Sequence, residues 1–459
     1  MKPNIDPVLK EIAALFNNAG KEIYLVGGAV RDMLRGQKIH DWDLATNALP
    51  EEVTGIIKRA GGKVVPTGIK HGTVTVFYGK NNAEITTFRT ESDYTDGRRP
   101  DQVEYAATIE EDLSRRDFTM NAIALRLPSG DIVDPFGGAK DIKLKIIRCV
   151  GNAAERFGED GLRPMRAVRF ASQLGYKIEK STLDATYGAL AVCAKVSWER
   201  VRDEVDKILA SSQPSIAFRL MEQTGLLKLF LSELADGRGV EQKGFHQFDV
   251  LDHSLYACDY AAAKNYPHEV RLAALFHDVG KPAVRGIDET GVYTFYGHEE
   301  VSANMCREIL ERLKYPNAVI EKVCHLTKEH MFLYTEDWTD AAVRRFIARV
   351  GEANLESVYQ LRRADIYGFS GKEPNYRSLL QLIERVNKIL AEGKAFALKD
   401  LAVCGNDLMT IGIPCGKMMG VILKELLETV LDDPEQNTRE KLLEIAERIY
   451  GERATGSAV

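Results

Sequence analysis

The chain has 459 residues, of which 45% are hydrophobic and 28% are charged, and its formal net charge is −6. This composition is typical of globular proteins, and a chain of this length usually folds into several domains, about two to four here. Every apolar run is shorter than the roughly 18 residues that a membrane-spanning helix requires. The net charge excludes a uniformly basic surface, but salt screens charges beyond about 10 Å, so a local basic patch remains compatible with nucleic-acid binding.

The seven cysteines are scattered along the chain without a Cys-x-x-Cys pair. This distribution argues against a disulfide framework and a zinc ribbon, and it suits a reducing compartment. Residues 1–16 lack a basic segment followed by an apolar stretch and a cleavage site, so we expect no secretory leader. The predicted location is the cytoplasm.

Residues 23–148 alternate between short strands and helices, which predicts a mixed α/β head. The apolar run 23–28 predicts a strand that ends in glycines, and residues 29–36 have helical spacing and a final glycine. Three further strands are predicted at 63–68, 73–79 and 83–89.

Beyond Gly151 the apolar residues recur at helical spacing, and almost no segment alternates as a strand does. Helices are predicted within 154–176, 196–211 and 215–230, and the same pattern continues to the C-terminus. The predicted fold class is therefore α+β, with a small α/β head followed by a long all-α body.

Asp41 and Asp43 stand two residues apart in the segment IHDWDLAT. On a strand, side chains at this spacing point to the same face, so both carboxylates converge on one site. Hard oxygen ligands suit Mg²⁺, and two ions about 3.5–4 Å apart bind both the attacking and the leaving oxygen of a phosphoryl transfer. The alternative is a pair of exposed acids in a turn or a helix cap.

A glycine pair precedes these acids at the end of the first predicted strand. Gly27 and Gly28 lie where a strand opens into a helix, so their backbone N–H groups can face phosphate oxygens. Arg31, one turn into the helix, adds a charged donor. A glycine pair alone is more often just a tight turn, but beside Asp41 and Asp43 it predicts a nucleotidyl-transfer site.

The order and spacing of five motifs resemble the class II tRNA nucleotidyltransferase and bacterial poly(A) polymerase family, which belongs to the polymerase-β-like superfamily. LVGGAVRDMLRG followed by DWDLAT is similar to the opening motif of that family. The later motifs are matched by RRDFTMNAIA (115–124), DPFGGAKDI (134–142), EDGLRPMRAVRFASQLGY (159–176) and WERVRDE (198–204). The resemblance implies a polymerase-β-like head, a helical neck and nucleotide addition to RNA without a nucleic-acid template.

The resemblance also implies that Asp160 and Arg163 recognise the base of the incoming nucleotide. A carboxylate only accepts hydrogen bonds and a guanidinium only donates them, so the pair matches the amino donor and ring acceptor of cytosine and adenine. Uracil and guanine present the opposite order and would leave two polar groups unpaired, at about 1–3 kcal/mol each. Asp160 and Arg163 are therefore expected to select CTP and ATP.

Arg166 and Arg169 resemble the arginines with which the family contacts the base and the phosphates. The alternative for the arginines of this segment is a surface ladder of ion pairs with Glu155 and Glu159.

Arg116 is the expected triphosphate contact and a catalytic candidate, and Asp117 resembles the residue that senses the ribose, unless both merely lie at a capped helix start. Glu84 is a candidate for a third metal ligand, with a solvent-facing strand acid as the alternative.

A second set of metal-ligand types lies in the all-α body. Their order is that of the ligands in the HD phosphohydrolase family, which this region resembles, and they would bind a divalent metal of unspecified identity. The candidates are His253, His277, Asp278 and Asp365, with His298 and His330 as extra ligands for a second ion. The family suggests phosphomonoester or 2′,3′-cyclic phosphate substrates, as in the repair of damaged tRNA ends, and a scaffold that helps to hold tRNA is the alternative.

We predict four domains with distinct roles. They are a nucleotidyltransferase head (1–150), a helical neck with the nucleotide-selecting motif and an RNA-binding region (151–235), an HD domain (236–370) and a helical C-terminal tail (371–459). No membrane partner is expected, and the sequence does not predict the oligomeric state.

The leading functional hypothesis is a tRNA nucleotidyltransferase that adds CCA, or part of it, to the tRNA 3′ end from CTP and ATP with Mg²⁺. Addition of CC alone is disfavoured because residues 87–113 match the flexible loop of the family without a deletion, whereas addition of A alone stays open. A poly(A) polymerase shares the head motifs, but the acidic C-terminal segment disfavours it. A third hypothesis is an HD phosphohydrolase with an inactive, RNA-binding head.

Overall fold

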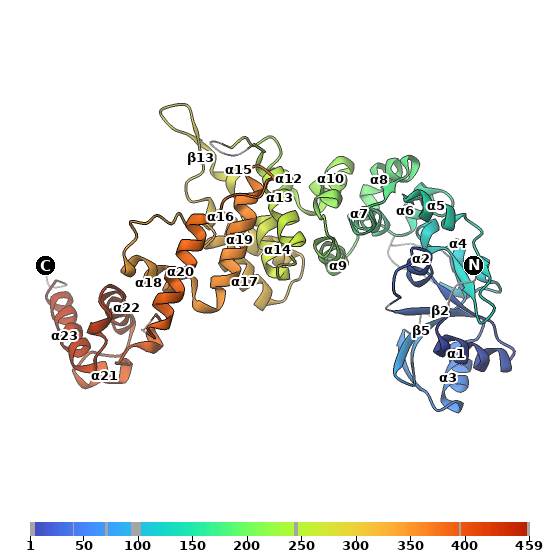
Figure 1. Ribbon diagram of the computed structural model, residues 1–459, viewed down its shortest axis with the longest axis horizontal. Helices are drawn as coiled ribbons and strands as arrows, with labels where there is room; N and C mark the ends of the chain where they lie inside the picture. Colours follow the sequence, from blue (N-terminus) through green and yellow to red (C-terminus); the bar gives the residue numbers. More distant parts are fainter. Residues whose placement is uncertain are drawn as a thin grey trace. The chain divides into compact units, whose positions relative to one another are not determined.

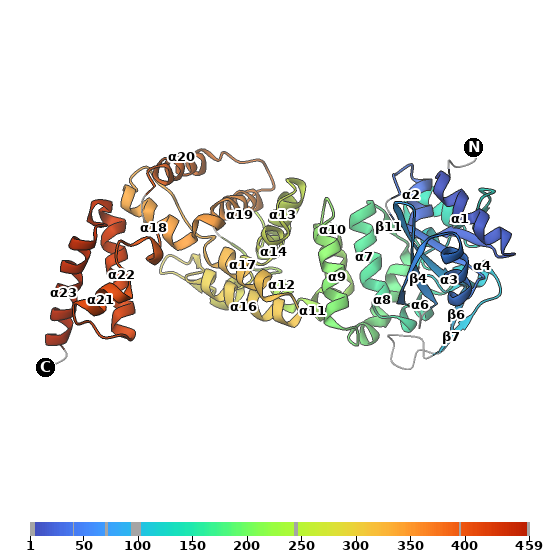
Figure 2. The same cartoon turned by 90° about the horizontal axis from the view of Figure 1, so that it is seen from below.

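The computed structural model describes residues 5–39, 41–68, 72–92, 102–242, 247–393 and 396–456 (Figures 1 and 2). The chain divides into two compact units, Met1–Asp236 with Glu311–Tyr315, and Gly237–Leu310 with Pro316–Val459. Within the described ranges, no helix is both long and apolar enough to span a bilayer.

A seven-stranded mixed sheet forms the head of the first unit, in the order β3-β4-β5-β2-β1-β8-β9. The strands are β1 (Ile23–Val26), β2 (Trp42–Thr46), β3 (Lys63–Gly68), β4 (Thr73–Tyr78), β5 (Asn81–Thr87), β8 (Ala124–Arg126) and β9 (Ile132–Val133). Strand β2 pairs with β5 in parallel, and the other neighbours are antiparallel. The α/β head and all four strands predicted from residues 23–89 are confirmed.

The sheet buries its centre and exposes the start of β2. All four residues of β1 are buried, whereas in β2 the buried stretch begins only at Leu44. Helices α1 (Pro7–Asn18), α2 (Gly28–Leu34) and α3 (Pro50–Arg59) pack against this sheet (Figure 1). The residues just before Leu44 therefore reach the surface from a rigid support.

Helices dominate the rest of the first unit. They are α4 (Ile109–Ser114), η2 (Thr119–Asn121), α5 (Gly138–Leu144), α6 (Ala153–Glu159), α7 (Arg163–Leu174), α8 (Lys180–Cys193), α9 (Trp198–Leu209), α10 (Ser215–Thr224), α11 (Leu226–Phe230) and α12 (Ser232–Ala235). Helix α7 begins at Arg163 because Pro164, which lacks a backbone N–H, suits the first helical turn. Two short pairings complete the unit, between β10 (Ile146–Ile147) and β11 (Lys177–Ile178), and between β6 (Arg89–Ser92) and β7 (Gln102–Tyr105).

The predicted flexible loop of residues 87–113 is described only at its two ends. Strands β6 and β7 form these ends, and residues 93–101 between them lie outside the described residues.

The second unit is almost entirely helical, as predicted. Its elements are α13 (Val250–Ala263), α14 (His268–Phe276), α15 (Lys281–Val284), β12 (Gly286–Ile287), β13 (Tyr293–Thr294), α16 (His298–Arg312), α17 (Asn317–Lys328), α18 (Asp340–Val350), η3 (Glu352–Asn354), α19 (Leu355–Gly368), α20 (Arg377–Ala391), η4 (Leu398–Asp400), α21 (Gly405–Thr410), α22 (Lys417–Asp432), η5 (Pro434–Gln436) and α23 (Arg439–Gly456). Helix α14 packs against α13, α17 and α19 (Figure 2). Because neighbours surround it, α14 buries residues on nearly all sides, and its C-terminal end lies in the interior.

Tight packing at the start of α5 makes Gly138 a sensitive position. A Cβ atom there would lie 2.0 Å from the backbone oxygen of Thr119. Because a backbone atom cannot move aside without displacing η2, we expect Gly138→Ala to lower the free energy of unfolding by about 2 kcal/mol or more. Urea titration followed by circular dichroism measures this loss.

The matched control is Gly188→Ala in α8, where no atom lies within 4 Å of an added Cβ. Alanine favours a helix interior, so this variant should match the parent or gain about 0.5–1 kcal/mol. Equal unfolding midpoints for the two variants would contradict the packing of α5 on η2.

Candidate functional site

The turn from β1 into α2 brings together the predicted glycine pair, two arginines and an acid. Gly27 has a φ of +68°, which favours glycine, and a Cβ there would lie 3.0 Å from Arg116 Nη1 and 3.9 Å from Asp43 Oδ2. At Gly28 the corresponding position is 3.5 Å from Arg31 Nη2. Two guanidinium groups and the Asp43 carboxylate therefore surround this turn.

Three carboxylates gather at the exposed start of β2. Asp41 precedes the strand, Asp43 is its second residue, and Asp43 pairs in register with Glu84 on the parallel strand β5. The pKa of Asp43 lies above its usual value, because partial withdrawal from water and the Glu84 and Asp41 carboxylates raise it more than Arg116 lowers it. A divalent cation would relieve this repulsion, so the residues present fit a metal held by oxygen ligands.

Arg116 is held against this group from behind by a buried acid that the sequence analysis missed. Asp112 on α4 is 1% exposed, and its Oδ2 accepts a hydrogen bond from Arg116 Nη2 at 3.0 Å, while Oδ1 accepts from Arg115. Burial raises the pKa of Asp112, but Arg116 and Arg115 outweigh it and lower the pKa. Arg116 Nε is buried and has no hydrogen-bond partner among the described residues. This N–H group is a donor that a bound anion could use.

Asn121 of the RRDFTMNAIA motif bridges Arg31 and Asp117 by hydrogen bonds. Arg31 Nη1 donates to Asn121 Oδ1 at 3.0 Å, and Asn121 Nδ2 donates to Asp117 Oδ1 at 3.1 Å. Burial raises the pKa of Asp117, but Arg166, whose Nη2 lies 2.6 Å from Oδ2, and Asn121 lower it to about 2. Asp117 is thus a charged acceptor at any physiological pH.

The structure gives Asp160 and Arg163 different partners. Asp160 Oδ1 accepts from the backbone N–H of Leu162 at 2.9 Å, and Oδ2 accepts from Arg200 Nη2 at 2.7 Å. Arg163 is 6% exposed, and its Nη1 donates to Glu159 at 2.6 Å.

Further contacts of Arg163 and Arg169 join α7 to other elements. Arg163 Nη2 donates to the backbone oxygen of Arg115 at 3.0 Å, and Arg169 Nε lies 2.5 Å from Glu204 Oε2. The structure also contains the ion pair between Arg163 and Glu159 that was predicted as part of the alternative surface ladder. It is buried on the arginine side.

Arg200, Glu204, Asp112 and Asn121 are site residues that sequence reasoning did not single out. Arg200 and Glu204 lie one helical turn apart on α9 within the matched segment WERVRDE, and this spacing was the available signal. Asp112 gave no signal, because an acid in a short helix is usually exposed.

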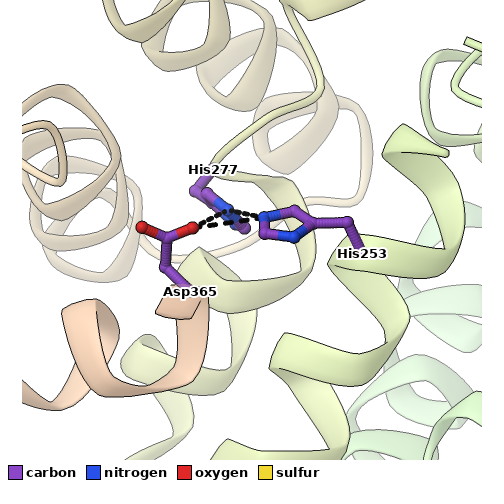
Figure 3. A group of neighbouring side chains, drawn as sticks. All are labelled: His253, His277 and Asp365. Atoms are coloured by element: carbon purple, nitrogen blue, oxygen red, sulfur yellow. Dashed lines mark hydrogen bonds and ion pairs between the residues drawn. The ribbon is translucent and has the colours of Figure 1, made fainter. Parts of the chain in front are cut away.

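All six predicted metal-ligand candidates of the second unit converge in its interior. His253 on α13, His277 after α14 and Asp365 on α19 point toward one another from three elements (Figure 3). The Nε2 atoms of His253 and His277 are 3.0 Å apart, and Asp365 Oδ1 lies 3.2 Å from His253 Nε2. These three side chains are at most 4% exposed and can offer ligand atoms to one ion.

Asp278 joins this group to a second one. Its Oδ2 lies 3.1 Å from His253 Nε2, and its Oδ1 lies 3.3 Å from His298 Nε2 and 3.7 Å from His330 Nε2. His277, Asp278 and His330 form a second possible ligand group. Burial lowers the pKa of His277, but Asp278 and Asp365 raise it to about 10. The acids thus favour positive charge at this centre, where a metal ion would replace the proton of His277, while burial lowers the pKa of His330.

Comparison with known protein families agrees with the geometry of the first unit. The Poly A polymerase head domain matches residues 23–148, the probable RNA- and SrmB-binding site of polymerase A matches residues 175–237, and the putative tRNA nucleotidyltransferase domain 2 matches residues 294–446. Together with the sheet and its acids, these matches define the class of the protein as a nucleotidyltransferase, an enzyme class that depends on divalent metal.

Proteins that are similar over nearly the whole chain show which family of nucleotidyltransferases it belongs to. The CCA-adding enzyme of Latilactobacillus sakei subsp. sakei is 36% identical over 442 residues, which is 96% of each chain. That of Lactobacillus delbrueckii subsp. bulgaricus is 34% identical over 95% of this chain and 96% of its own. A crystal structure of the Bacillus stearothermophilus CCA-adding enzyme in complex with CTP matches with a TM-score of 0.73 and 30% identity, over 98% of this chain and 100% of that one. The chain belongs to the CCA-adding enzyme family.

Replacing Gly27 tests the close approach of Arg116 to the β1–α2 turn. Gly27→Ala adds a methyl group 3.0 Å from Arg116 Nη1 and should displace the guanidinium from Asp43. We expect kcat/KM for nucleotide addition to fall by about 10- to 100-fold, because misplaced charged groups stabilise the transition state less.

Gly36→Ala is the matched control, because Gly36 also has a positive φ, +71°, but nothing lies within 4 Å of an added Cβ. It carries the same backbone strain without the contact. If both variants lose activity equally, strain and not the displacement of Arg116 explains the loss.

Proposed function

We propose that this chain adds the CCA end to the 3′ terminus of tRNA from CTP and ATP, with no nucleic-acid template. The observation that carries the proposal is the group Asp41, Asp43 and Glu84 beside Gly27 and Arg116, in a chain that resembles CCA-adding enzymes from end to end. The match of the C-terminal region to a tRNA nucleotidyltransferase domain favours tRNA over the poly(A) alternative.

Asp41 and Asp43, with Glu84 as a third carboxylate, would hold Mg²⁺. The ion, when bound, supplies charge neutralisation for the phosphates of the nucleotide and the RNA terminus. Arg116, fixed by Asp112 and with its Nε free of described partners, would bind the triphosphate. Gly28 and Arg31 would contact the same phosphates from the β1–α2 turn.

The reaction is an in-line displacement at the α-phosphorus of the nucleotide. The 3′ oxygen of the RNA forms a bond to this phosphorus, the bond to the bridging oxygen of the β-phosphate breaks, and pyrophosphate leaves. The chain contributes by holding both reactants in this orientation and by placing arginines where negative charge accumulates.

Asp160 would accept a hydrogen bond from the amino group of cytosine or adenine, with Arg163 as the donor to the ring nitrogen. A carboxylate has about four acceptor positions, and the contacts with Leu162 and Arg200 occupy two of them. Capacity for a base therefore remains. Asp117, ionised and aligned by Arg166, would accept from the ribose hydroxyl, and Arg169 would complete the nucleotide-binding set.

The arrangement into head, neck, HD domain and tail, at 1–150, 151–235, 236–370 and 371–459, is part of this proposal. A cytoplasmic location is proposed as well, because tRNA and nucleoside triphosphates are the substrates and all seven cysteines are free.

The central experiment offers the protein tRNAs that end before C74, before C75 and before A76, with each nucleoside triphosphate in turn. We expect CTP to extend the first two and ATP the third, and product length on a gel distinguishes complete CCA addition from A addition and from poly(A) addition. Asp43→Asn should slow all three steps by about 100-fold or more, because it removes a charged metal ligand.

Asp131→Asn, a change at an exposed turn of the same head, should extend all three tRNAs like the parent. Parental rates for Asp43→Asn would overturn the proposed site.

A second activity is proposed for the buried centre of the second unit. The six ligand candidates come from five segments of the second unit, with His277 and Asp278 adjacent, and the observed distances bring them to one place. We propose that they bind a divalent metal and that the centre hydrolyses phosphomonoesters or 2′,3′-cyclic phosphates at RNA ends. The rival is a purely structural centre.

Loss of the metal should separate the two activities. His277→Ala removes a side chain shared by both ligand groups, so we expect the variant to lose divalent metal, measured by mass spectrometry of the purified protein, and to lose hydrolysis of 2′,3′-cyclic AMP. Nucleotide addition should stay within about twofold of the parent, since the residues of the two sites belong to separate compact units and share no described partner.

His268→Ala, at the start of the same helix, is the control that should keep metal and both activities. A parent protein that takes up no divalent metal would refute the centre, and a joint collapse of both activities in His277→Ala would favour the structural rival.

A further inference from the structure

The most exposed large apolar side chains surround the buried centre of the second unit in the sequence. Among the described residues, Tyr296 is 86% exposed, Leu333 74% and Ile287 66%, and every other large apolar side chain is less exposed. Tyr296 stands two residues before the ligand candidate His298. Leu333 stands three residues after His330. Single exposed apolar residues are ordinary on a protein surface, but this concentration beside two ligand candidates indicates a surface that contacts a partner.

Residues 285–297 form the hairpin arm, which leads from the surface to the start of α16. Strands β12 and β13 pair within the arm, with Ile287 opposite Tyr293. At the tip, Asp288 Oδ1 accepts a hydrogen bond from the backbone N–H of Thr290 at 2.9 Å and holds the turn. The arm lies at the edge of the helices of the second unit (Figure 1). It is therefore a defined surface element whose side chains reach water.

The inner end of the arm is fixed to the buried centre through Phe295. The backbone oxygen of Phe295 accepts a hydrogen bond from His298 Nδ1 at 2.8 Å, which leaves Nε2 of that ring to face a metal. The ring centroid of Phe295 lies 5.7 Å from Lys281 Nζ, and this amine lies 2.6 Å from Asp278 Oδ2. The next residue in the chain, Tyr296, is consequently held at the surface beside the centre.

A cation and aromatic rings occur together along the arm. Arg285 Cζ lies 3.8 Å from the centroid of the Tyr293 ring. Arg285 is exposed, and no ion pair joins it to an acid in the part of the chain that the structure describes. An arginine stacked on a ring can still bind a phosphate, whereas an exposed ring such as that of Tyr296 offers its face to a base. The two groups match the alternating phosphates and bases of single-stranded RNA.

We propose that the hairpin arm binds the end of a single-stranded RNA and presents it to the metal centre of the second unit. Tyr296 stacks on the terminal base, and Arg285 contacts the phosphodiester next to it. The inference rests on the proposed hydrolysis at this centre and specifies the substrate, which is an RNA end with an intact terminal base and not a small phosphate ester. Because every base has a face on which a ring can stack, all four terminal bases should be accepted.

The test compares two short RNAs that both end in a 2′,3′-cyclic phosphate, one with a terminal adenine and one with an abasic terminal ribose. A second pair ends in a 3′-phosphate, so that both proposed substrates are covered. The full chain is loaded in turn with Mn²⁺, Ni²⁺ and Zn²⁺, which suit mixed histidine and carboxylate ligands, and the most active form is used throughout.

We expect Tyr296→Ala to lower kcat/KM on the intact RNA by about 10-fold, mainly through a higher KM, because the stacking contact is lost. On the abasic RNA this variant should match the parent. Tyr296→Phe keeps an aromatic ring and should match the parent on both RNAs.

Arg285→Ala tests the second contact of the arm. It should lower kcat/KM by about fivefold on both RNAs, with or without the terminal base, but not on 2′,3′-cyclic AMP, which has no neighbouring phosphodiester. The loss should shrink as the salt concentration rises, because salt screens contacts with phosphate. An equal loss on 2′,3′-cyclic AMP would contradict this contact.

Tyr187→Ala is the matched control, because Tyr187 is a 49% exposed tyrosine of α8 in the first unit, and it should match the parent on both RNAs. Parental kcat/KM for Tyr296→Ala on the intact RNA would overturn the inference and leave the hydrolytic centre in place. An equal loss on the intact and the abasic RNA would also overturn it, since a structural role produces that result.

Binding separates this failure from a failure of the proposed activity. If the parent hydrolyses neither RNA pair with any of the metals, the proposed activity is wrong, and the Kd of fluorescently labelled intact RNA decides about the arm. An increase in Kd of about 10-fold in Tyr296→Ala supports the arm as an RNA-binding element, and an unchanged Kd refutes it. Melting temperatures should equal that of the parent, because the side chain of Tyr296 is exposed.

Discussion

Guanidinium groups that are buried or partly buried need carboxylate partners, and this requirement governs how α7 is held; Arg163 and Arg169 are buried, and Arg166 is one third exposed. Arg163 pairs with Glu159 at the end of α6, Arg166 with Asp117 of the head, and Arg169 with Glu204 of α9. An unpaired charge in the interior would cost several kcal/mol, so each arginine ties α7 to a different element. Helix α7 is consequently fixed relative to the sheet that carries Asp43, so the residues proposed for base recognition and those proposed for metal binding have one common support.

The same electrostatic rule shapes the head itself. Asp112 neutralises Arg115 and Arg116 from the protein side, whereas the solvent side of Arg116 faces Asp43. Among the described residues, the acids at the start of β2 lack a comparable set of cations. Partial withdrawal from water and the neighbouring carboxylates raise the pKa of Asp43, whereas Arg116 and Arg115 lower that of Asp112. The difference agrees with the proposal that Asp112 supports Arg116 and that the β2 acids bind the metal.

The second unit balances its buried charges in a different way. Its six ligand candidates are buried with two flanking cations, Lys281 beside Asp278 and Arg362 beside Asp365. One unit holds this centre and the other holds the β2 acids, so the two groups of residues are supported by separate cores. A change at His277 therefore acts on a different set of packed residues from a change at Asp43.

Many of the secondary-structure elements and the metal-ligand candidates could be predicted from the amino-acid sequence. The spacing of apolar residues predicted β1, β3, β4 and β5, because alternation with period two is a local property of the chain. The shift to helical spacing after Gly151 predicted the all-α body for the same reason. Recognition of Asp41, Asp43 and the second-unit histidines followed from residue type and order, since metal ligands are few in kind.

Local sequence could not say which charge pairs with which. The segment 155–169 offers several acids and arginines at helical spacing, and nothing within it distinguishes a solvated ladder from buried pairs with Asp117 or Glu204. Asp160 and Arg163 are three residues apart, yet the fold gives one of them to Arg200 and the other to Glu159. Partner choice depends on which groups lose water together, and only the packing of α4, α6, α7 and α9 against one another decides that.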